Sequence, residues 1–159
     1  MIRYDGLADW YDGYNAAAAA ANGERIGSLL GAGSGRCLDI GCGTGQYFDV
    51  IRATGRSVIG TDRSGDQLRI AARHPVPLVQ ADAAELPFRD AVFDTVTAFW
   101  ISTDVDDFGA VIAEASRVLK PGGTLLYYGV HPCFNGPHTQ VVDGGARVLH
   151  PAVDHALHC

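Results

Sequence analysis

The sequence predicts an α/β fold in which a mostly parallel sheet carries helices on both faces. Three observations lead to this prediction. Short apolar segments alternate with segments of helical periodicity between residues 37 and 130. The segment VFDTVTAFW, residues 92–100, is nearly continuous in apolar and β-branched residues, as a strand buried on both faces should be. The segment CLDI, residues 37–40, leads into the glycine-rich loop GCGTG, at a place where open parallel sheets bind ligands.

The composition suits one globular domain, since 47% of the 159 residues are hydrophobic. The net charge of -6 and the absence of a basic run argue against a nucleic-acid partner or an anionic membrane surface. We therefore expect a small-molecule partner. The N-terminus lacks a basic start and a long apolar run, so we expect a cytoplasmic protein.

The first half of the chain begins with a helix from about Leu7 to Leu30, which Asn22-Gly23 could break. In chain order, the elements expected next are a strand at Cys37–Ile40, a helix from about Gly45, a strand at Ser57–Asp62, and a helix with its N-cap at Ser64.

The second half continues the alternation of strands and helices. We expect strands at Pro77–Asp82 and Val92–Trp100, a helix at Phe108–Leu119, a turn at Lys120–Gly123, a strand at Thr124–Val130, and a hairpin within Val141–Leu149. The single domain then comprises an N-terminal helical lid segment (residues 1–34), a ligand-binding core (35–132), and a hairpin with an irregular tail (133–159).

The spacing of the glycines and acids narrows the class of ligand. Glycines at 41, 43 and 45 let the backbone approach a ligand, but Gln46 stands where a dinucleotide fingerprint has its last glycine. Asp62, about 20 residues after the first glycine, can accept hydrogen bonds from both hydroxyls of a ribose. Asp82 ends the next strand, where it can meet an adenine amino group. These features favour a nucleoside-containing ligand other than NAD.

Five segments together resemble the class I S-adenosylmethionine-dependent methyltransferases, particularly their small-molecule group. They are LDIGCGTG, VIGTDRS, ADAAELPF, FDTVTAFW and VLKPGGTLLYYGV, in order and with matching spacing. The resemblance implies a Rossmann-like fold and S-adenosylmethionine as cofactor. It also implies the cofactor-binding residues Tyr11, Asp39, Gly41, Cys42, Gly43, Thr44, Gly45, Asp62, Arg63, Ser64, Asp82, Ala83 and Phe99.

The N-terminal segment YDGLADWYDGY resembles the lid of many members, so Tyr4, Tyr11 and Tyr14 are candidates to close over cofactor and substrate. Methyl transfer chiefly needs alignment of the acceptor and exclusion of water, because the sulfonium is already a good electrophile. A hydroxyl acceptor would also need a general base, and His131 and Asp104 are the catalytic candidates.

The histidines and cysteines of the C-terminal segment could in principle hold a metal, but none of the usual paired spacings occurs, so we expect no metal site. Members of the family normally continue through another helix and two more strands. We therefore expect a shortened C-terminal part, with the edge of Thr124–Val130 covered by the hairpin or by another chain. The alternative expectation is a truncated form of the fold whose acceptor pocket is deficient. Two alternatives to an active transferase remain: a cofactor-binding module without turnover, and an NAD-dependent oxidoreductase.

Overall fold

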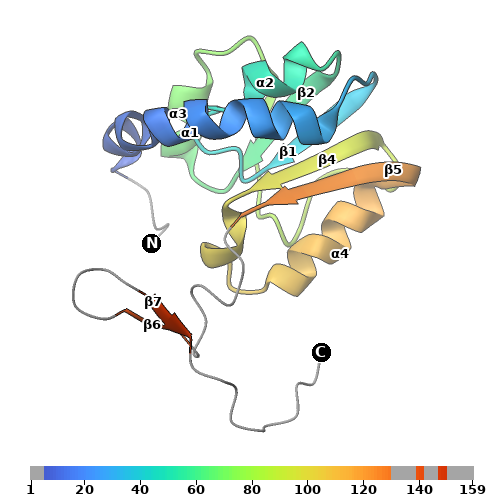
Figure 1. Cartoon of the computed structure of the whole chain (residues 1–159). Coiled ribbons are helices and arrows are strands. Elements are labelled where there is room, and N and C mark those ends of the chain that lie inside the picture. Colours follow the sequence, from blue (N-terminus) through green and yellow to red (C-terminus); the bar gives the residue numbers. More distant parts are fainter. Residues whose placement is uncertain (1–5, 130–138, 142–146, 150–159) are drawn as a thin grey trace, which may run out of the picture. The chain divides into compact units, whose positions relative to one another are not determined.

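A five-stranded parallel sheet with the order β3-β2-β1-β4-β5 forms the centre of the unit Met1–Tyr128 (Figure 1). Its strands are β1 (Arg36–Ile40), β2 (Ser57–Asp62), β3 (Leu78–Gln80), β4 (Phe93–Phe99) and β5 (Leu119–Tyr128). All four pairings are parallel, which confirms the predicted sheet. The strand order reverses between β1 and β4, so the carboxyl ends of these strands border the crevice where such sheets bind ligands.

The computed structural model describes residues 6–129, 139–141 and 147–149. The second unit, Gly129–Cys159, contains β6 (Thr139–Val141) and β7 (Arg147–Leu149), which pair antiparallel. This pairing confirms the predicted hairpin, although β6 begins two residues earlier than expected. The two strands form a two-stranded sheet of their own.

Helices cover both faces of the larger sheet, as predicted. Figure 1 shows α1 (Ala8–Leu30), α2 (Phe48–Ala53) and α3 (Gly65–Ala71) on one face and α4 (Phe108–Val118) on the other. Each face has its own buried cluster, one containing Ile26, Phe48 and Ile51, the other Val96 and Val111. Burying these apolar side chains stabilises the sheet between its two helical layers. None of the helices in the described part of the chain is both long and apolar enough to cross a membrane.

Helix α1 runs through Asn22-Gly23 without the predicted break. A Cβ at Gly23 would lie 3.2 Å from Cγ2 of Val50, so the glycine permits close packing of α1 on α2. At the other end of α1, the Arg56 guanidinium donates to the carbonyls of Leu30 (3.2 Å) and Gly31 (2.9 Å). Packing and capping therefore outweigh the low helix propensity of the Asn-Gly pair.

The turn expected at Lys120–Gly123 is instead a bulge within β5. Leu119 already pairs with Phe93, and the register shifts before Thr124 pairs with Thr95. The Lys120 ammonium lies 2.6 Å from the Asp94 carboxylate, which holds the bulge against β4. The sequence signal for a reversal was correct in its location, but the chain uses it to shift register.

Helix α2 begins at Phe48, three residues later than predicted. Gly45 has a φ of +79°, a left-handed conformation that an α-helix does not contain. The glycine loop is consequently longer than expected, and it extends further over the carboxyl end of the sheet.

Candidate functional site

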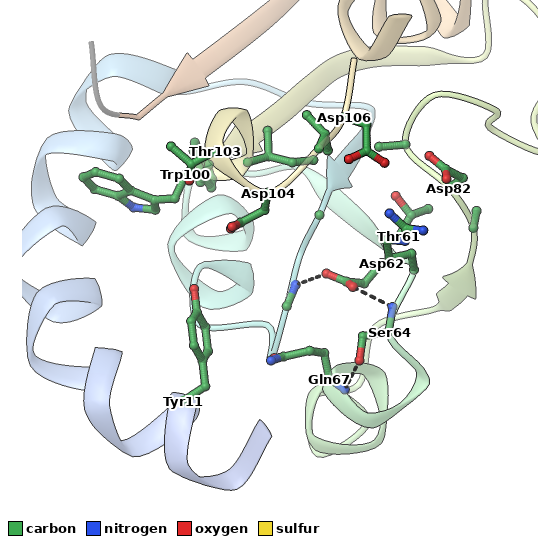
Figure 2. Close-up of a pocket in the computed structure, with 18 residues that line it drawn as sticks. Tyr11, Thr61, Asp62, Ser64, Gln67, Asp82, Trp100, Thr103, Asp104 and Asp106 are labelled. Atoms are coloured by element: carbon green, nitrogen blue, oxygen red, sulfur yellow. Dashed lines mark hydrogen bonds between the residues drawn. The ribbon is translucent and has the colours of Figure 1, made fainter. Parts of the chain in front are cut away.

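A cavity of about 550 Å³ lies at the carboxyl ends of the strands (Figure 2). Its volume falls within the range of about 300–1,000 Å³ typical of small-molecule sites. Four segments and two helices contribute its walls: the glycine loop, residues 61–64 at the end of β2, residues 81–83 after β3, residues of the stretch 99–106 at the end of β4, α1 through Tyr11, and α3 through Gln67. This is the crevice that the order of the strands predicts.

Asp62, the last residue of β2, is fixed in the cavity wall by backbone amides. Its carboxylate accepts hydrogen bonds from the N–H of Gly43 and from the N–H of Ser64, both at 2.9 Å. Burial raises the pKa of Asp62, although these amides act in the opposite direction. Because a carboxylate can accept about four hydrogen bonds, the fixed group retains capacity for ligand hydroxyls.

Asp39 does not line the cavity, contrary to the sequence prediction. It lies within β1 and is only 2% exposed, and its Oδ1 accepts a hydrogen bond of 2.7 Å from the Thr97 hydroxyl of β4. Burial, with a smaller contribution from the charge of Asp62, raises the pKa of Asp39 to about 7. Asp39 therefore joins two strands behind the cavity.

Only part of the predicted glycine loop faces the cavity. Gly41 and Gly43 line it, whereas Cys42, Thr44 and Gly45 do not. Cys42 is buried in the cluster beneath the loop, where burial raises the pKa of its thiol well above the usual value. Gly43 has a φ of +55°, which glycine adopts without strain, and this conformation presents its N–H to Asp62.

The remaining cofactor-binding candidates meet at the cavity. Besides Asp62, they are Tyr11, Arg63, Ser64, Asp82, Ala83 and Phe99. Ser64 also accepts a hydrogen bond of 3.3 Å from the Gln67 N–H as the N-cap of α3, as predicted. Asp82 accepts a hydrogen bond of 2.9 Å from the Ala84 N–H. The structure thus brings together side chains from four separate segments of the sequence.

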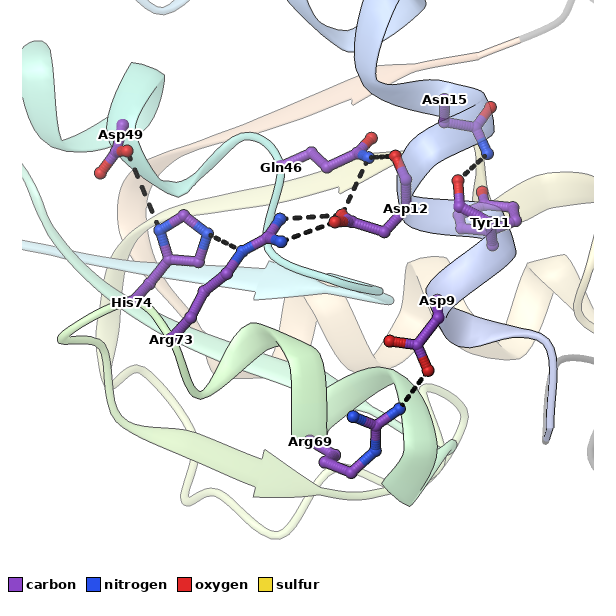
Figure 3. Close-up of polar contacts among 9 residues, drawn as sticks. All are labelled: Asp9, Tyr11, Asp12, Asn15, Gln46, Asp49, Arg69, Arg73 and His74. Atoms are coloured by element: carbon purple, nitrogen blue, oxygen red, sulfur yellow. Dashed lines mark hydrogen bonds and ion pairs between the residues drawn. The ribbon is translucent and has the colours of Figure 1, made fainter.

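Ion pairs hold α1 over α3 and bring Tyr11 to the cavity (Figure 3). Arg73 binds the Asp12 carboxylate through two nitrogens, at 2.6 and 2.8 Å, and Arg69 binds Asp9 at 2.7 Å. Gln46 of the glycine loop donates to the Asp12 carbonyl at 2.8 Å. The residue that replaces the last glycine of a dinucleotide fingerprint therefore connects the loop to the helix above it.

Tyr11 points its hydroxyl toward Asp104 in Figure 2, and burial followed by the charge of Asp104 raises the tyrosine pKa. Tyr14, the other described lid candidate, lies outside the cavity wall. Its side chain is 71% exposed and stacks on Trp10 with ring centroids 4.9 Å apart. Tyr4 lies outside the described residues.

The segment after β4 contributes the wall opposite Asp62. Trp100 adopts a left-handed φ of +61°, which is unusual for a bulky residue. Its N–H donates to the Tyr128 carbonyl at 2.8 Å, and its indole N–H donates to the Tyr47 hydroxyl at 3.1 Å. These contacts hold the strained residue in place.

Of the two catalytic candidates, Asp104 lines the cavity, while His131 lies outside the described residues. The histidines and cysteines of residues 130–159 also lie outside the described residues. Among the residues that the structure does describe, no group of three His, Cys, Asp or Glu side chains is placed to hold a metal ion.

Sequence reasoning did not identify several wall residues, notably Thr61, Gln67, Trp100, Thr103, Val105 and Asp106. Trp100 and Asp106 belong to a segment whose conformation no motif specifies. Gln67 lies three residues after the N-cap Ser64, in the turn of α3 nearest the end of β2, but this position alone does not specify where its side chain points.

The walls carry more negative than positive charge. Asp62, Asp82, Asp104 and Asp106 line the cavity together with one cationic residue, Arg63. A cleft lined mainly by one sign of charge attracts ligands of the opposite sign. This arrangement favours a ligand with cationic groups.

The parallel sheet, the cavity at its strand-order reversal and the fixed acid after β2 define a class I S-adenosylmethionine-dependent methyltransferase fold. Comparison with known proteins agrees. Residues 38–127, more than half of the chain, match the Methyltransferase domain family, and the chain belongs to this family.

Curated relatives and solved structures support the same assignment. Demethylmenaquinone methyltransferase of Staphylococcus saprophyticus is 37% identical over 112 residues, which are 65% of this chain and 48% of the relative. A SAM-dependent methyltransferase structure from Thermotoga maritima matches with a TM-score of 0.68 and 26% identity, over 78% of this chain and 58% of that one. The structure of the [4+2]-cyclase SpnF matches with a TM-score of 0.58 and 33% identity, over 65% and 43% of the two chains. This chain spans about half the length of the curated relatives that it matches.

Proposed function

We propose that this chain binds S-adenosylmethionine in the cavity after β2 and directs transfer of its methyl group to a small-molecule acceptor. The observation that supports the proposal best is Asp62, which the amides of Gly43 and Ser64 hold at 2.9 Å in the wall of a cavity of about 550 Å³. A carboxylate held in this way is suited to accept hydrogen bonds from the two hydroxyls of a ribose.

The other walls suit the remaining parts of this cofactor. Asp82 and Ala83 lie after β3, where they would meet the adenine edge, and Phe99 ends β4, where its backbone would meet the methionine group. When bound, S-adenosylmethionine supplies a methyl group on a sulfonium, which is already electrophilic. The acidic walls would stabilise its positive charge, and Tyr11 would exclude water from above.

The acceptor that we favour is the reduced naphthoquinone ring implied by the names of the curated relatives. Tyr11 and Trp100 give the cavity aromatic walls against which a planar ring can pack. Asp104 lies in the same part of the cavity and would take the proton that a phenolic acceptor loses. Its carboxylate would then act as general base.

The test measures binding and turnover separately. Calorimetry with S-adenosylhomocysteine should show micromolar binding, and the product assay should detect S-adenosylhomocysteine release in the presence of a reduced, short-chain demethylmenaquinone. Asp104→Asn should lower turnover by about 10²-fold or more without weakening cofactor binding. Asp90→Asn, which removes an exposed carboxylate from the surface, is the matched control. Binding of NADH in place of S-adenosylhomocysteine would contradict the proposal.

A second candidate function is cofactor binding without methyl transfer. One observation favours it: the solved structure of SpnF, to which this chain is similar, is named as a cyclase and not as a methyltransferase. In that case S-adenosylhomocysteine would bind with the expected affinity, but S-adenosylmethionine would not be converted to S-adenosylhomocysteine with any acceptor.

A further inference from the structure

Gln67, in the first turn of α3, has a buried side chain that the protein itself does not satisfy. The residue is 2% exposed, and among the described residues neither its amide nitrogen Nε2 nor its amide oxygen Oε1 has a hydrogen-bond partner. Leaving such a group unpaired in the interior destabilises a protein, because the group loses its hydrogen bonds to water and gains none in return. A glutamine retained at this price requires an explanation other than packing.

The side chain lies against the cavity and next to its fixed acid. Gln67 lines the cavity, and Figure 2 shows it extending from α3 toward the glycine loop, below Asp62. A Cβ built on Gly43 would lie 3.6 Å from Oε1 of Gln67, and the Gly43 N–H is the group that binds Asp62. The carboxamide and the carboxylate therefore both lie next to the same loop residue.

The chemistry of these two groups is complementary toward a vicinal diol. An ionised carboxylate only accepts hydrogen bonds, so hydroxyls that donate to Asp62 keep lone pairs that need a donor. The amide nitrogen of Gln67 carries two N–H donors, and its oxygen can accept a further hydrogen bond. A ligand with a diol at this place would satisfy the atoms of Gln67 that the protein leaves unpaired.

We propose that Gln67 is a second ribose-binding residue. Its carboxamide hydrogen-bonds the same ribose diol of the adenosine group whose hydroxyls donate to Asp62. This inference rests on the proposed function, because it takes an S-adenosyl ligand as the occupant. It assigns Gln67 a role in specificity, since a site built around a hydroxyl rejects a ligand that lacks it.

A ligand-by-variant cycle tests the proposal. S-adenosylhomocysteine and its 2′-deoxy and 3′-deoxy derivatives are titrated into the wild-type chain and into Gln67→Met, which keeps the length of the side chain without its polar atoms. We expect the variant to bind S-adenosylhomocysteine about 10- to 100-fold more weakly, the range for a lost buried hydrogen bond. With at least one deoxy derivative, the two proteins should differ by about twofold or less, because the contact is already absent.

Gln80→Met is the matched control. It makes the same replacement on an exposed glutamine of β3, whose amide donates to the Arg63 carbonyl at 3.0 Å, and it should leave affinity unchanged. Gln67→Asn, which keeps the amide but shortens its reach, should bind as weakly as Gln67→Met. Gln67→Met should unfold at or above the wild-type temperature, because it removes an unpaired buried amide.

Each other result has a definite meaning. If Gln67→Met binds S-adenosylhomocysteine as tightly as the wild type, the amide binds a buried water or has only a structural role, and the inference is overturned. Equal weakening toward all three ligands also overturns it, because the ribose is then not what Gln67 contacts. Failure of the wild-type chain to bind S-adenosylhomocysteine would instead refute the proposed function itself. Should Gln67→Met fail to fold, equal wild-type affinities for the parent ligand and both deoxy derivatives would overturn the inference.

Discussion

Asp39 and Asp62 lie in different environments, although both are near the carboxyl ends of two neighbouring parallel strands, β1 and β2. Asp62 is the final residue of β2 and receives two backbone amides, whereas Asp39 is inside β1 and receives one hydroxyl from Thr97. The first is presented to the cavity and the second is enclosed behind it. Two different measurements can separate their roles.

Asp62→Asn should weaken binding of S-adenosylhomocysteine by about 10²-fold, because an amide cannot accept from both ribose hydroxyls and both backbone N–H groups. Calorimetry at constant pH measures the change. Asp49→Asn is the control, since that carboxylate is 72% exposed and contacts Arg52 on the surface. Unchanged affinity in Asp62→Asn would show that the ribose lies elsewhere.

Asp39→Asn should make the protein more stable at pH 8 and leave it nearly unchanged at pH 4. Burial raises the pKa of Asp39 to about 7, so between its unfolded value of about 3.8 and about 7 the folded state holds a proton that the unfolded state has lost. Stability from this group is therefore present at low pH and is lost as the pH rises toward 7.

Asparagine removes that dependence and can still accept from the Thr97 hydroxyl. We expect a gain on the order of 1–4 kcal/mol at pH 8, measured by urea unfolding at both pH values. Asp90→Asn, which makes the same replacement on a side chain that is 77% exposed, is the control and should not raise the stability at pH 8. A loss of stability in Asp39→Asn at pH 8 would mean that the ionised carboxylate has a stabilising partner.

At the residue scale, spacing alone located Asp62, because the acid that ends the second strand stands at a fixed distance from the glycine loop. It could not place Asp39, since a shift of one residue along a buried strand decides whether a side chain faces the cavity or a neighbouring strand. Gln67 was missed for a related reason. Its orientation depends on the direction in which α3 leaves Ser64, and no local pattern contains that information.

At the scale of elements, α1 is the part of the site that charged contacts position. Asp12 pairs with Arg73 at 2.6 Å, and its carboxylate is only 20% exposed. The hydrogen bond from Arg73 lowers the pKa of Asp12 to about 2. The pair therefore stabilises the docked helix at neutral pH, and its contribution is lost as the pH falls from about 4 toward 2.

Asp12→Asn should loosen the N-terminal half of α1 and weaken S-adenosylhomocysteine binding by about threefold to tenfold, because Tyr11 is the neighbouring residue. The ion pair is partly exposed, so we expect a loss of about 0.5–1 kcal/mol in stability. Hydrogen exchange of the amides of residues 8–16 measures the loosening.

Asp9→Asn is the matched control for this variant. It removes the ion pair with Arg69, in which the carboxylate is 82% exposed, and its effect should be smaller. Equal exchange in wild type and Asp12→Asn would show that the apolar contacts of α1, rather than Arg73, hold the helix in place.

Most of the elements could be predicted because each carries its own periodicity. The helix-strand alternation, the N-cap at Ser64 and the antiparallel pairing of residues 139–149 are local signals, and the structure confirms them. The unbroken α1 and the bulge at Lys120–Gly123 depend on distant partners, Val50 and Asp94 respectively. Tertiary contacts of this kind override the turn propensity of glycine and proline.

At the scale of the whole molecule, the sheet order fixes where strands lack neighbours. Among the described residues, β5 pairs with β4 only, and the hairpin of residues 139–149 pairs within itself. The backbone groups on the outer side of a ten-residue strand are therefore open to another strand. That the hairpin or another chain covers this edge stays a prediction, and pairing with another chain is the part of it that can be tested on copies of this chain.

We expect copies of this chain to associate through β5. Hydrogen exchange measured over a range of protein concentrations should show slower exchange in residues 119–128 as the concentration rises, because an added strand would bond the outer N–H groups. Strand β3, at the opposite edge of the same sheet, has only three residues and serves as the internal control. Sedimentation velocity on the same samples should show the 16.8 kDa chain in equilibrium with a dimer. A single monomer species with concentration-independent exchange in β5 would rule this association out, and the edge would then need a partner other than a second copy.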